Sequence, residues 1–314
     1  MKIVILDRDT LGDVDLTCIE NLGQTVVYGS TPQDLSAERL IDADVVILNK
    51  VKLNESNLKE AKNLKLICVT ATGYDNIDLE YCKKAGIALC NVPGYSTDSV
   101  AQVSVAAALS LAVNLFSYRN YVHSGQYTKA GLANHVTPSF NEISSLKWGV
   151  VGGGNIGMKV ADIAASFGGE VFVCRRKQEG IYPLMNIDTM CKECDIITIH
   201  TPLNDSTKNL ISKERIASMK QGVIIVNTAR GAVCDEAALA DAVKSGKIGG
   251  LSVDVYSKEP FDENHPYNEI LKNENVVLLP HMAWAARQSR QRCLDIISVS
   301  IQKFFEGNPQ HRIV

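Results

Sequence analysis

Short runs rich in valine and isoleucine recur through the first hundred residues, and apolar positions at helical spacing separate each run from the next. Runs of four residues that are apolar on both faces, alternating with helical patterns, are typical of buried strands in a parallel sheet. The pattern therefore predicts a first α/β domain with five parallel strands, at residues 3–6, 25–28, 45–48, 66–69 and 87–90.

A second series of apolar runs begins in the middle of the chain, and it alternates with helical patterns in the same way. Its six runs lie at residues 148–151, 171–174, 196–199, 223–226, 251–255 and 276–279. A chain of 314 residues exceeds the usual size of one domain. We therefore predict an α/β protein with two doubly wound parallel-sheet domains and a closing amphipathic helix whose apolar face runs from Cys293 to Phe305 and could pack on either domain.

Charge and cysteine usage narrow the class of ligand and the compartment. Lysine and arginine total 32 against 35 for aspartate and glutamate, so the net charge gives no electrostatic reason to expect binding to nucleic acid or to an anionic membrane. We therefore expect a small soluble ligand. The nine cysteines are odd in number and scattered, which favours reduced thiols in a cytoplasmic protein. Cys191 and Cys194 form a CxxC pair without a second pair at metal-ligand spacing, so we expect packing residues and no metal.

Neither end of the chain nor its apolar stretches suggests a membrane or an export signal. A predicted strand follows Lys2 at once, without the pattern of a signal peptide. The most hydrophobic stretch, residues 100–116, is interrupted by polar residues and falls short of the ~20 apolar residues that a bilayer span requires. We expect a buried helix there.

A glycine-rich turn joins the first strand of the second series to a helical pattern. Residues 152–157 read GGGNIG and satisfy GxGxxG in the strand–turn–helix context of a dinucleotide site. Glycines allow the backbone to approach a pyrophosphate, whose charge is met by free N–H groups and the helix dipole. The predicted cofactor contacts are Gly152, Gly154, Asn155, Ile156 and Gly157; the alternative is a plain strand-to-helix link.

Two arginines, Arg175 and Arg176, follow the next strand, where an NAD site usually carries an acidic residue for the ribose hydroxyls. A carboxylate repels a 2′-phosphate, whereas a guanidinium pairs with it. The pair favours NADP over NAD, and a solvated basic turn remains the alternative.

Three polar residues lie just beyond strands of the second series: Arg230, Glu259 and His281. The carboxyl edge of an open α/β sheet is where ligands bind. Reduction of a ketone by hydride needs a cation for the substrate and an acid for the developing alkoxide. Histidine, with an ordinary pKa of about 6.5, can exchange protons near neutral pH, and a neighbouring carboxylate favours its imidazolium form. Each residue alone has a structural explanation; together they predict a catalytic site.

A series of motifs occurs in order along the sequence: TGYDNID at 72–78, followed by NVPGYS at 91–96, then GGGNIG at 152–157, NTARG at 227–231, VDVYSKEP at 253–260 and PHMAW at 280–284. In this order they resemble a known family, the D-isomer-specific 2-hydroxyacid dehydrogenases, and the resemblance extends over essentially all of the sequence. Several ordered motifs are far more specific than any one of them.

The resemblance implies a discontinuous architecture. A flavodoxin-like substrate domain would comprise residues 1–97 and 287–314, and a Rossmann dinucleotide-binding domain residues 98–286. It also implies a homodimer, joined largely through the central domain and the irregular segment 118–145.

The resemblance also implies residue roles. Arg230 would bind substrate, Glu259 would orient His281, and His281 would be the general acid/base. The remaining expected contacts to cofactor are Thr201, Pro202, Thr228, Ala229 and Asp254, the last facing the nicotinamide carboxamide. The expected contacts to substrate are Lys50, Ala71, Thr72, Gly73 and Trp284.

Within the family, the NKV triplet at 49–51 and the spacing of His281 and Trp284 most resemble the glycerate dehydrogenase, or hydroxypyruvate reductase, branch. The expected reaction is NAD(P)H-dependent reduction of hydroxypyruvate or glyoxylate. Alternatives are a dehydrogenase of D-lactate or of branched D-2-hydroxy acids and a non-catalytic, dinucleotide-sensing module of the co-repressor type. Formate dehydrogenases carry Gln where Glu259 stands, and 3-phosphoglycerate oxidation needs cations for a phosphate. Arg175 and Gln102 depart from the family pattern.

Overall fold

A computed structural model describes residues 1–176 and 180–314, and it divides into two compact units. Unit 1 comprises residues 1–96 and 285–314, and unit 2 comprises residues 97–284. The boundaries expected from the sequence, 97/98 and 286/287, lie one and two residues from these.

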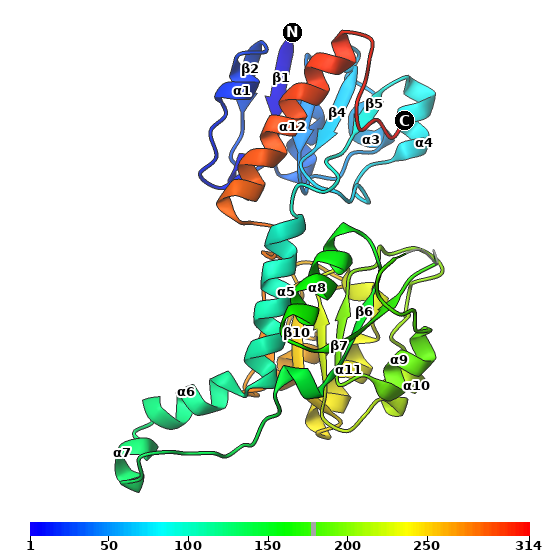
Figure 1. Ribbon diagram of the computed structural model, residues 1–314. Helices are drawn as coiled ribbons and strands as arrows, with labels where there is room; N and C mark the ends of the chain where they lie inside the picture. The colour runs from blue at the N-terminus through cyan, green and yellow to red at the C-terminus, as the bar shows by residue number, and fades with distance from the viewer. Residues whose placement is uncertain (177–179) are drawn as a thin grey trace. The chain divides into compact units, whose positions relative to one another are not determined.

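Unit 1 is built on a five-stranded parallel sheet with the order β2-β1-β3-β4-β5 (Figure 1). This is the flavodoxin-like strand order that the resemblance implied. The strands are β1 (Lys2–Ile5), β2 (Gln24–Val27), β3 (Val45–Leu48), β4 (Leu66–Val69) and β5 (Ala88–Cys90). The helices are α1 (Thr17–Glu20), α2 (Ser36–Leu40), α3 (Glu55–Leu58), α4 (Leu79–Ala85) and the closing α12 (Arg287–Phe305), with 3-10 turns η1 (Arg8–Leu11) and η2 (Gln33–Leu35).

The C-terminal helix returns to unit 1, which its apolar sequence pattern alone did not decide. Its apolar face is buried, and Ser298 donates a 2.8 Å hydrogen bond to the carbonyl oxygen of Cys18 beside α1. The last residues then pair with β5, where the N–H of Ile313 donates to the carbonyl oxygen of Leu89 at 2.7 Å. Both ends of the chain therefore build one unit.

Unit 2 is built on a six-stranded parallel sheet with the order β11-β10-β9-β8-β6-β7 (Figure 1). Its strands are β6 (Lys147–Val151), β7 (Glu170–Cys174), β8 (Ile196–Ile199), β9 (Val223–Asn227), β10 (Ile248–Val253) and β11 (Val276–Leu278). Its helices are α5 (Thr97–Ala112), α6 (Leu115–His123), α7 (Gln126–Ala130), α8 (Asn155–Ser166), α9 (Ile187–Glu193), α10 (Lys213–Ser218) and α11 (Glu236–Lys244), with 3-10 turns η3 (Ile143–Ser145), η4 (Gly231–Val233) and η5 (Pro266–Ile270).

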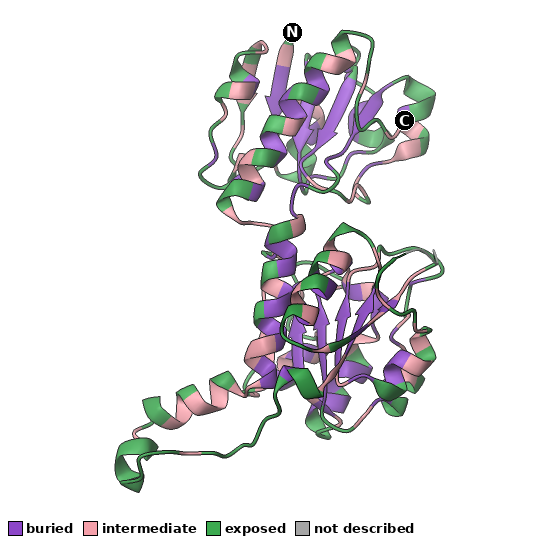
Figure 2. Cartoon of the chain, viewed as in Figure 1, coloured by how far each residue is buried: buried purple, intermediate pink, exposed green. Residues whose placement is uncertain are grey.

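Burial on both sides accounts for the uninterrupted apolar runs in the sequence. Figure 2 shows buried residues concentrated on the strands of each sheet, as expected where helices cover both faces. In unit 2, α5 and α8 contribute to the apolar cluster that contains Trp148, while α9, α10 and α11 contribute to a second cluster. Cys191 and Cys194 belong to this second cluster, so they are core residues. The two doubly wound sheets predicted from the sequence are confirmed.

Two stretches of unit 2 differ from the sequence-based expectation in detail. The apolar helix expected over residues 100–116 ends at Ala112, and α6 follows after a bend of 63°. Within the described part of the chain, no single helix has the length and apolarity to cross a bilayer, although this bent pair passes by length and composition. The segment 118–145, expected to be irregular, begins with α6 and α7.

The first turn of α8 tolerates no side chain at Gly157. A Cβ there would lie 1.9 Å from the carbonyl oxygen of Gly152. We expect Gly157→Ala to reduce the free energy of unfolding by roughly 1–3 kcal/mol, the range typical of overpacking. Thermal unfolding measures this, with Gly154→Ala as the matched control because no atom lies within 4 Å of a Cβ at that position. Equal stability of the two variants would contradict the packing argument.

Candidate active site

The six-stranded sheet gathers the predicted chemistry at one edge. Because all its strands are parallel, their carboxyl ends lie on the same side of unit 2. A predicted site residue follows each strand: Gly152 follows β6, Arg175 follows β7, Thr201 follows β8, Arg230 follows β9, Glu259 follows β10 and His281 follows β11. Since β9, β10 and β11 are neighbours, the last three lie on adjacent strand ends.

The glycine-rich turn has the backbone geometry of a phosphate site. Gly152 adopts φ +104°, a conformation that glycine allows, and a Cβ there would lie 2.7 Å from the carbonyl carbon of His200. Gly154 caps α8 without a side-chain hydrogen bond, so the first N–H groups of the helix, including those of Asn155 and Ile156, are directed at this end of the helix. These residues fit the pyrophosphate of a dinucleotide.

His200 is a candidate cofactor contact that the sequence reasoning missed. It directly follows β8, and its Nδ1 lies 3.3 Å from the hydroxyl oxygen of Thr228, which also contacts Ser104 at 2.9 Å. Its buried Nε2 has no hydrogen-bond partner among the described residues, and burial lowers the pKa of His200 to about 3. The ring is therefore neutral and enclosed, while the backbone of His200 packs against Gly152 in the glycine-rich turn; its place at a strand end was the available signal. Thr201 and Pro202 continue this loop.

The two arginines after β7 lie beside the glycine turn. Arg175 packs over Gly153, where a Cβ would meet its Cδ at 2.5 Å, and its Nη1 lies 3.8 Å from the sulfur of Met158. Its buried Nε has no hydrogen-bond partner in the described residues. Arg176 donates from Nη2 to the hydroxyl of Ser206. Both guanidinium groups thus lie at the strand end where the ribose of a dinucleotide is expected.

The structure brings His281 and Glu259 into direct contact. His281 Nδ1 lies 2.6 Å from Glu259 Oε2, and both side chains are about one-quarter exposed (26% and 29%). The other carboxylate oxygen accepts the N–H of Tyr256 at 3.0 Å, so the acid is held from its own loop. Trp284 donates from its indole nitrogen to the carbonyl oxygen of His281 at 2.9 Å. An imidazole oriented through Nδ1 transfers protons through Nε2.

Asp254 holds the turn that follows His281. Its carboxylate is buried and accepts the N–H groups of Met282 and Ala283, each at 2.8 Å. Burial raises the pKa of Asp254, because desolvation penalises its charged form. Whatever contact Asp254 makes to a cofactor, it also positions the backbone beside the acid/base.

Arg230 lies at the neighbouring strand end, in a loop organised by Asn227. The Asn227 side chain accepts the N–H of Ala229 and donates to the carbonyl oxygen of Arg230, both at 3.0 Å. The guanidinium donates from Nη1 to the carbonyl oxygen of Ala229 at 2.7 Å. The structure therefore pairs Glu259 with His281, while Arg230 is anchored through its own loop.

The expected substrate contacts of unit 1 lie at the carboxyl edge of its own sheet. Lys50 follows β3, and Ala71, Thr72 and Gly73 follow β4. The buried Asp7 accepts the N–H of Lys50 at 2.6 Å and also binds the N–H groups of residues 49 and 51. Gln102 is exposed on α5, and nothing in the structure explains its departure from the family pattern.

Comparisons with known proteins identify the family of this chain. A family model described as "D-isomer specific 2-hydroxyacid dehydrogenase, NAD binding domain" matches residues 105–283. Hydroxypyruvate reductase of Blautia hydrogenotrophica is 33% identical (98% of both chains), and glycerate dehydrogenase of Methylorubrum extorquens is 32% identical (99% of this chain, 98% of that one). The crystal structure of D-lactate dehydrogenase from Aquifex aeolicus, complexed with NAD and lactic acid, superposes with a TM-score of 0.85 at 29% identity, covering 98% of this chain and 96% of that one.

Proposed function

The chain belongs to the D-isomer-specific 2-hydroxyacid dehydrogenase family, and from that premise we propose that it reduces hydroxypyruvate or glyoxylate with NAD(P)H to the corresponding 2-hydroxy acid. The observation that carries the proposal is the 2.6 Å contact between His281 and Glu259 at the carboxyl edge of a dinucleotide-binding sheet. The names of the relatives from Blautia hydrogenotrophica and Methylorubrum extorquens support this choice of substrates.

The protein's own residues perform the proton transfer. When bound, the reduced dinucleotide supplies a hydride for the keto carbon of the substrate. Protonated His281 donates its Nε2 proton to the keto oxygen, so that the carbonyl becomes an alcohol. Glu259 holds the ring in one orientation through Nδ1. Arg230 binds the substrate carboxylate, and Trp284 contacts the substrate from the same unit.

His281→Ala is expected to lower kcat by roughly 10² to 10⁴ fold, the usual contribution of a positioned acid/base. The dissociation constant for NADPH should stay unchanged, because the glycine turn lies on a different strand of the sheet. Stopped-flow or steady-state absorbance of the reduced cofactor measures kcat, and fluorescence titration measures binding. His311→Asn, at an exposed site of unit 1 whose positive φ asparagine also adopts, is the control. Full turnover by the His281 variant would refute the assignment.

The substrate choice is tested with a panel of keto acids. Oxidation of NADPH and of NADH is followed separately with hydroxypyruvate, glyoxylate, pyruvate and branched 2-keto acids. We expect the highest kcat/KM with hydroxypyruvate or glyoxylate. A preference for pyruvate or the branched acids would favour the alternatives that act on lactate or on branched 2-hydroxy acids, and no oxidation with any compound would favour a dinucleotide-sensing module.

For the cofactor, the proposal favours NADP over NAD. The guanidinium groups of Arg175 and Arg176 lie at the end of β7, and neither makes an ion pair that the described residues record. Ser206 joins them through its contact to Arg176. Two guanidinium groups and a hydroxyl suit a 2′-phosphate, whereas no carboxylate follows directly after Cys174 to receive ribose hydroxyls.

Replacing both arginines, in Arg175→Ala/Arg176→Ala, should lower kcat/KM for NADPH by roughly 10- to 100-fold, since a charge-assisted hydrogen bond contributes about 1.5–3 kcal/mol. The value for NADH should change little. Arg312→Ala, an exposed arginine of unit 1, is the matched control. An equal loss with both cofactors would show that the arginines are structural.

We also propose a homodimer, formed through the arm of residues 115–140. In Figure 1, α6 and α7 extend away from the six-stranded sheet of unit 2. The arm is ordered by its own contacts: Tyr121 stacks on His135 with ring centroids 3.8 Å apart, and Tyr118 donates to the carbonyl oxygen of Pro138 at 2.6 Å. It nevertheless exposes six large apolar side chains, which are Leu115, Val122, Tyr127, Leu132, Val136 and Phe140. An apolar surface of this kind favours a partner, and a second copy is the one that the family implies.

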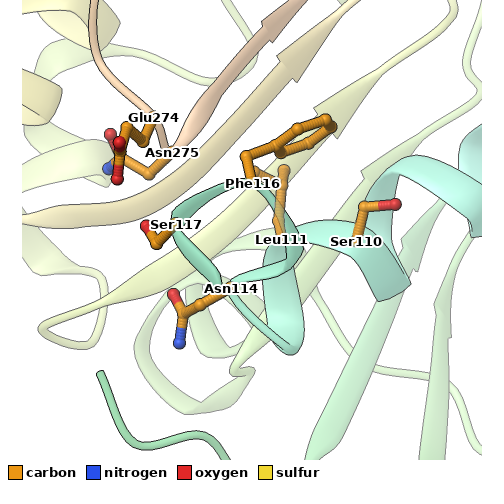
Figure 3. A pocket seen from close by; sticks show the side chains of 7 residues that line it. All are labelled: Ser110, Leu111, Asn114, Phe116, Ser117, Glu274 and Asn275. Atoms are coloured by element: carbon orange, nitrogen blue, oxygen red, sulfur yellow. The ribbon is translucent and has the colours of Figure 1, made fainter. Parts of the chain in front are cut away.

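The base of the arm is braced against the sheet. Hydrogen bonds from Asn120 and Ser117 lower the pKa of Glu274, and the Asn120 contact measures 2.8 Å. Figure 3 shows the small pocket at this junction, with Asn114, Ser117 and Glu274 among its lining residues; its volume of about 10 Å³ suits a single water molecule rather than a metabolite. The bracing keeps the arm directed outward.

Leu132→Glu/Val136→Glu is expected to convert the dimer into a monomer, because these side chains are 66% and 73% exposed in the isolated protomer and charge there opposes burial. Light scattering after size-exclusion chromatography measures the mass. Ile41→Glu, at a 53% exposed site of unit 1, should leave the dimer intact. A wild-type monomer would contradict the proposal.

A cytoplasmic location is likewise proposed, supported by nine free cysteines, and subcellular fractionation tests it.

A further inference from the structure

A buried acid, Glu236, lies behind the loop that carries Glu259, and the proton transfer described above does not use it. Glu236 begins α11, and its Oε2 lies 3.2 Å from Nε2 of His265. Both side chains are almost enclosed, with 10% and 8% of their surface exposed. A buried carboxylate is costly unless it is fully paired, so its partners indicate what it supports.

The partners of Glu236 lie in the loop of Glu259. Oε1 accepts the N–H of Ser257 at 3.0 Å, and Oε2 accepts the hydroxyl of the same residue. The backbone is thereby held two residues before Glu259. Glu236 therefore fixes a main-chain atom of this loop. Movement of that atom would displace the carboxylate of Glu259 directly.

His265 is itself fixed in orientation. Its Nδ1 accepts the N–H of Tyr267 at 3.3 Å, so Nε2 is the nitrogen that donates to Glu236. Its ring packs among Tyr256, Phe261 and Tyr267, with centroids 6.0, 4.8 and 4.8 Å away. The pair is a rigid support rather than a flexible surface contact.

The loop that Glu236 holds also contacts the other loops of the site. Tyr256 donates its N–H to Glu259, and its hydroxyl donates to the carbonyl oxygen of Leu279 at 2.8 Å, two residues before His281. From the other side, a Cβ on Gly231 would lie 2.1 Å from the carbonyl carbon of Tyr256 and 2.2 Å from the nitrogen of Ser257. The loop that follows Arg230 is thus in close backbone contact with the loop that Glu236 holds.

We propose that Glu236, oriented by His265, is a positioning residue that holds the loop of residues 256–260 and so sets the contact between Glu259 and His281. The expected loss of kcat rests on the proposed function, whereas the expected loss of the contact between Glu259 and His281 rests on the structure alone. Without the acid, Ser257 loses both acceptors and the carboxylate of Glu259 is no longer held against the ring.

Two substitutions test the kinetic consequence in the full-length protein with NADPH. Glu236→Gln keeps the shape of the side chain and an oxygen that accepts the N–H of Ser257. Its NH₂ group, however, faces the N–H of His265, so that two donors meet. Glu236→Ala removes every contact. Since a misplacement of about 1 Å costs on the order of 10² fold in rate, we expect kcat to fall by roughly 10- to 100-fold, most in the alanine variant. KM and the dissociation constant for NADPH should change little.

Lys258→Ala is the matched control, because Lys258 lies in the same loop but its ion pair with Asp262 is exposed. It should retain the wild-type kcat. A folded Glu236→Gln protein with wild-type kcat, or an equal loss in the lysine variant, would overturn the proposal.

A double-mutant cycle separates positioning from general loss of stability. In the Glu259→Gln background, Glu236→Gln should lower kcat little further, since the carboxylate that it positions is already gone. Independent, multiplying losses would show that Glu236 acts by another route.

The geometric consequence is read without any turnover. In protein labelled with ¹⁵N-histidine, the hydrogen-bonded Nδ1 proton of His281 is assigned by its absence in His281→Ala. Glu236→Gln should broaden or remove this resonance, while Lys258→Ala should keep it. If the wild-type protein reduces none of the keto acids, the proposed function fails, and this resonance still decides the positioning role. An unchanged resonance in the folded Glu236→Gln protein overturns it.

Discussion

The parallel direction of the six strands in unit 2 is the constraint on which the site depends. It places the ends of all strands on one side, so residues far apart in the sequence meet without any long excursion of the backbone. The contact between His281 and Glu259 joins the ends of two neighbouring strands, β11 and β10. An antiparallel neighbour would have sent one of these loops to the opposite edge.

Loops at such an edge have unpaired backbone groups, and this protein satisfies them with buried side-chain acceptors. Asn227 binds the N–H of Ala229, Asp254 binds those of Met282 and Ala283, and Glu236 binds that of Ser257. Burial raises the pKa of Asp254, because desolvation disfavours its charged form. The hydrogen bonds from the two N–H groups act in the opposite direction.

The same solution appears independently in unit 1. Asp7 follows β1, and its carboxylate receives the N–H groups of residues 49–51 after β3. Burial raises the pKa of Asp7 as well, with the backbone hydrogen bonds opposing the shift. In both units, rigid loops are obtained by enclosing a polar acceptor, which limits how far the chemical groups on those loops can move.

Apolar periodicity determined the fold, because strands buried on both faces must be continuously apolar and the two series are separated along the sequence. The glycine turn, the arginines after β7 and the residues Arg230, Glu259 and His281 were also readable, since each follows a strand and carries its own chemistry. Only the tertiary structure revealed which residues hold the loops of the site in place. Glu236 and His265 have no distinguishing sequence pattern: an acid at a helix start is common, and a histidine becomes informative only when its ring is enclosed. His200 differs only in its place at a strand end. Their roles depend on burial and on partners up to dozens of residues away, which local sequence does not encode.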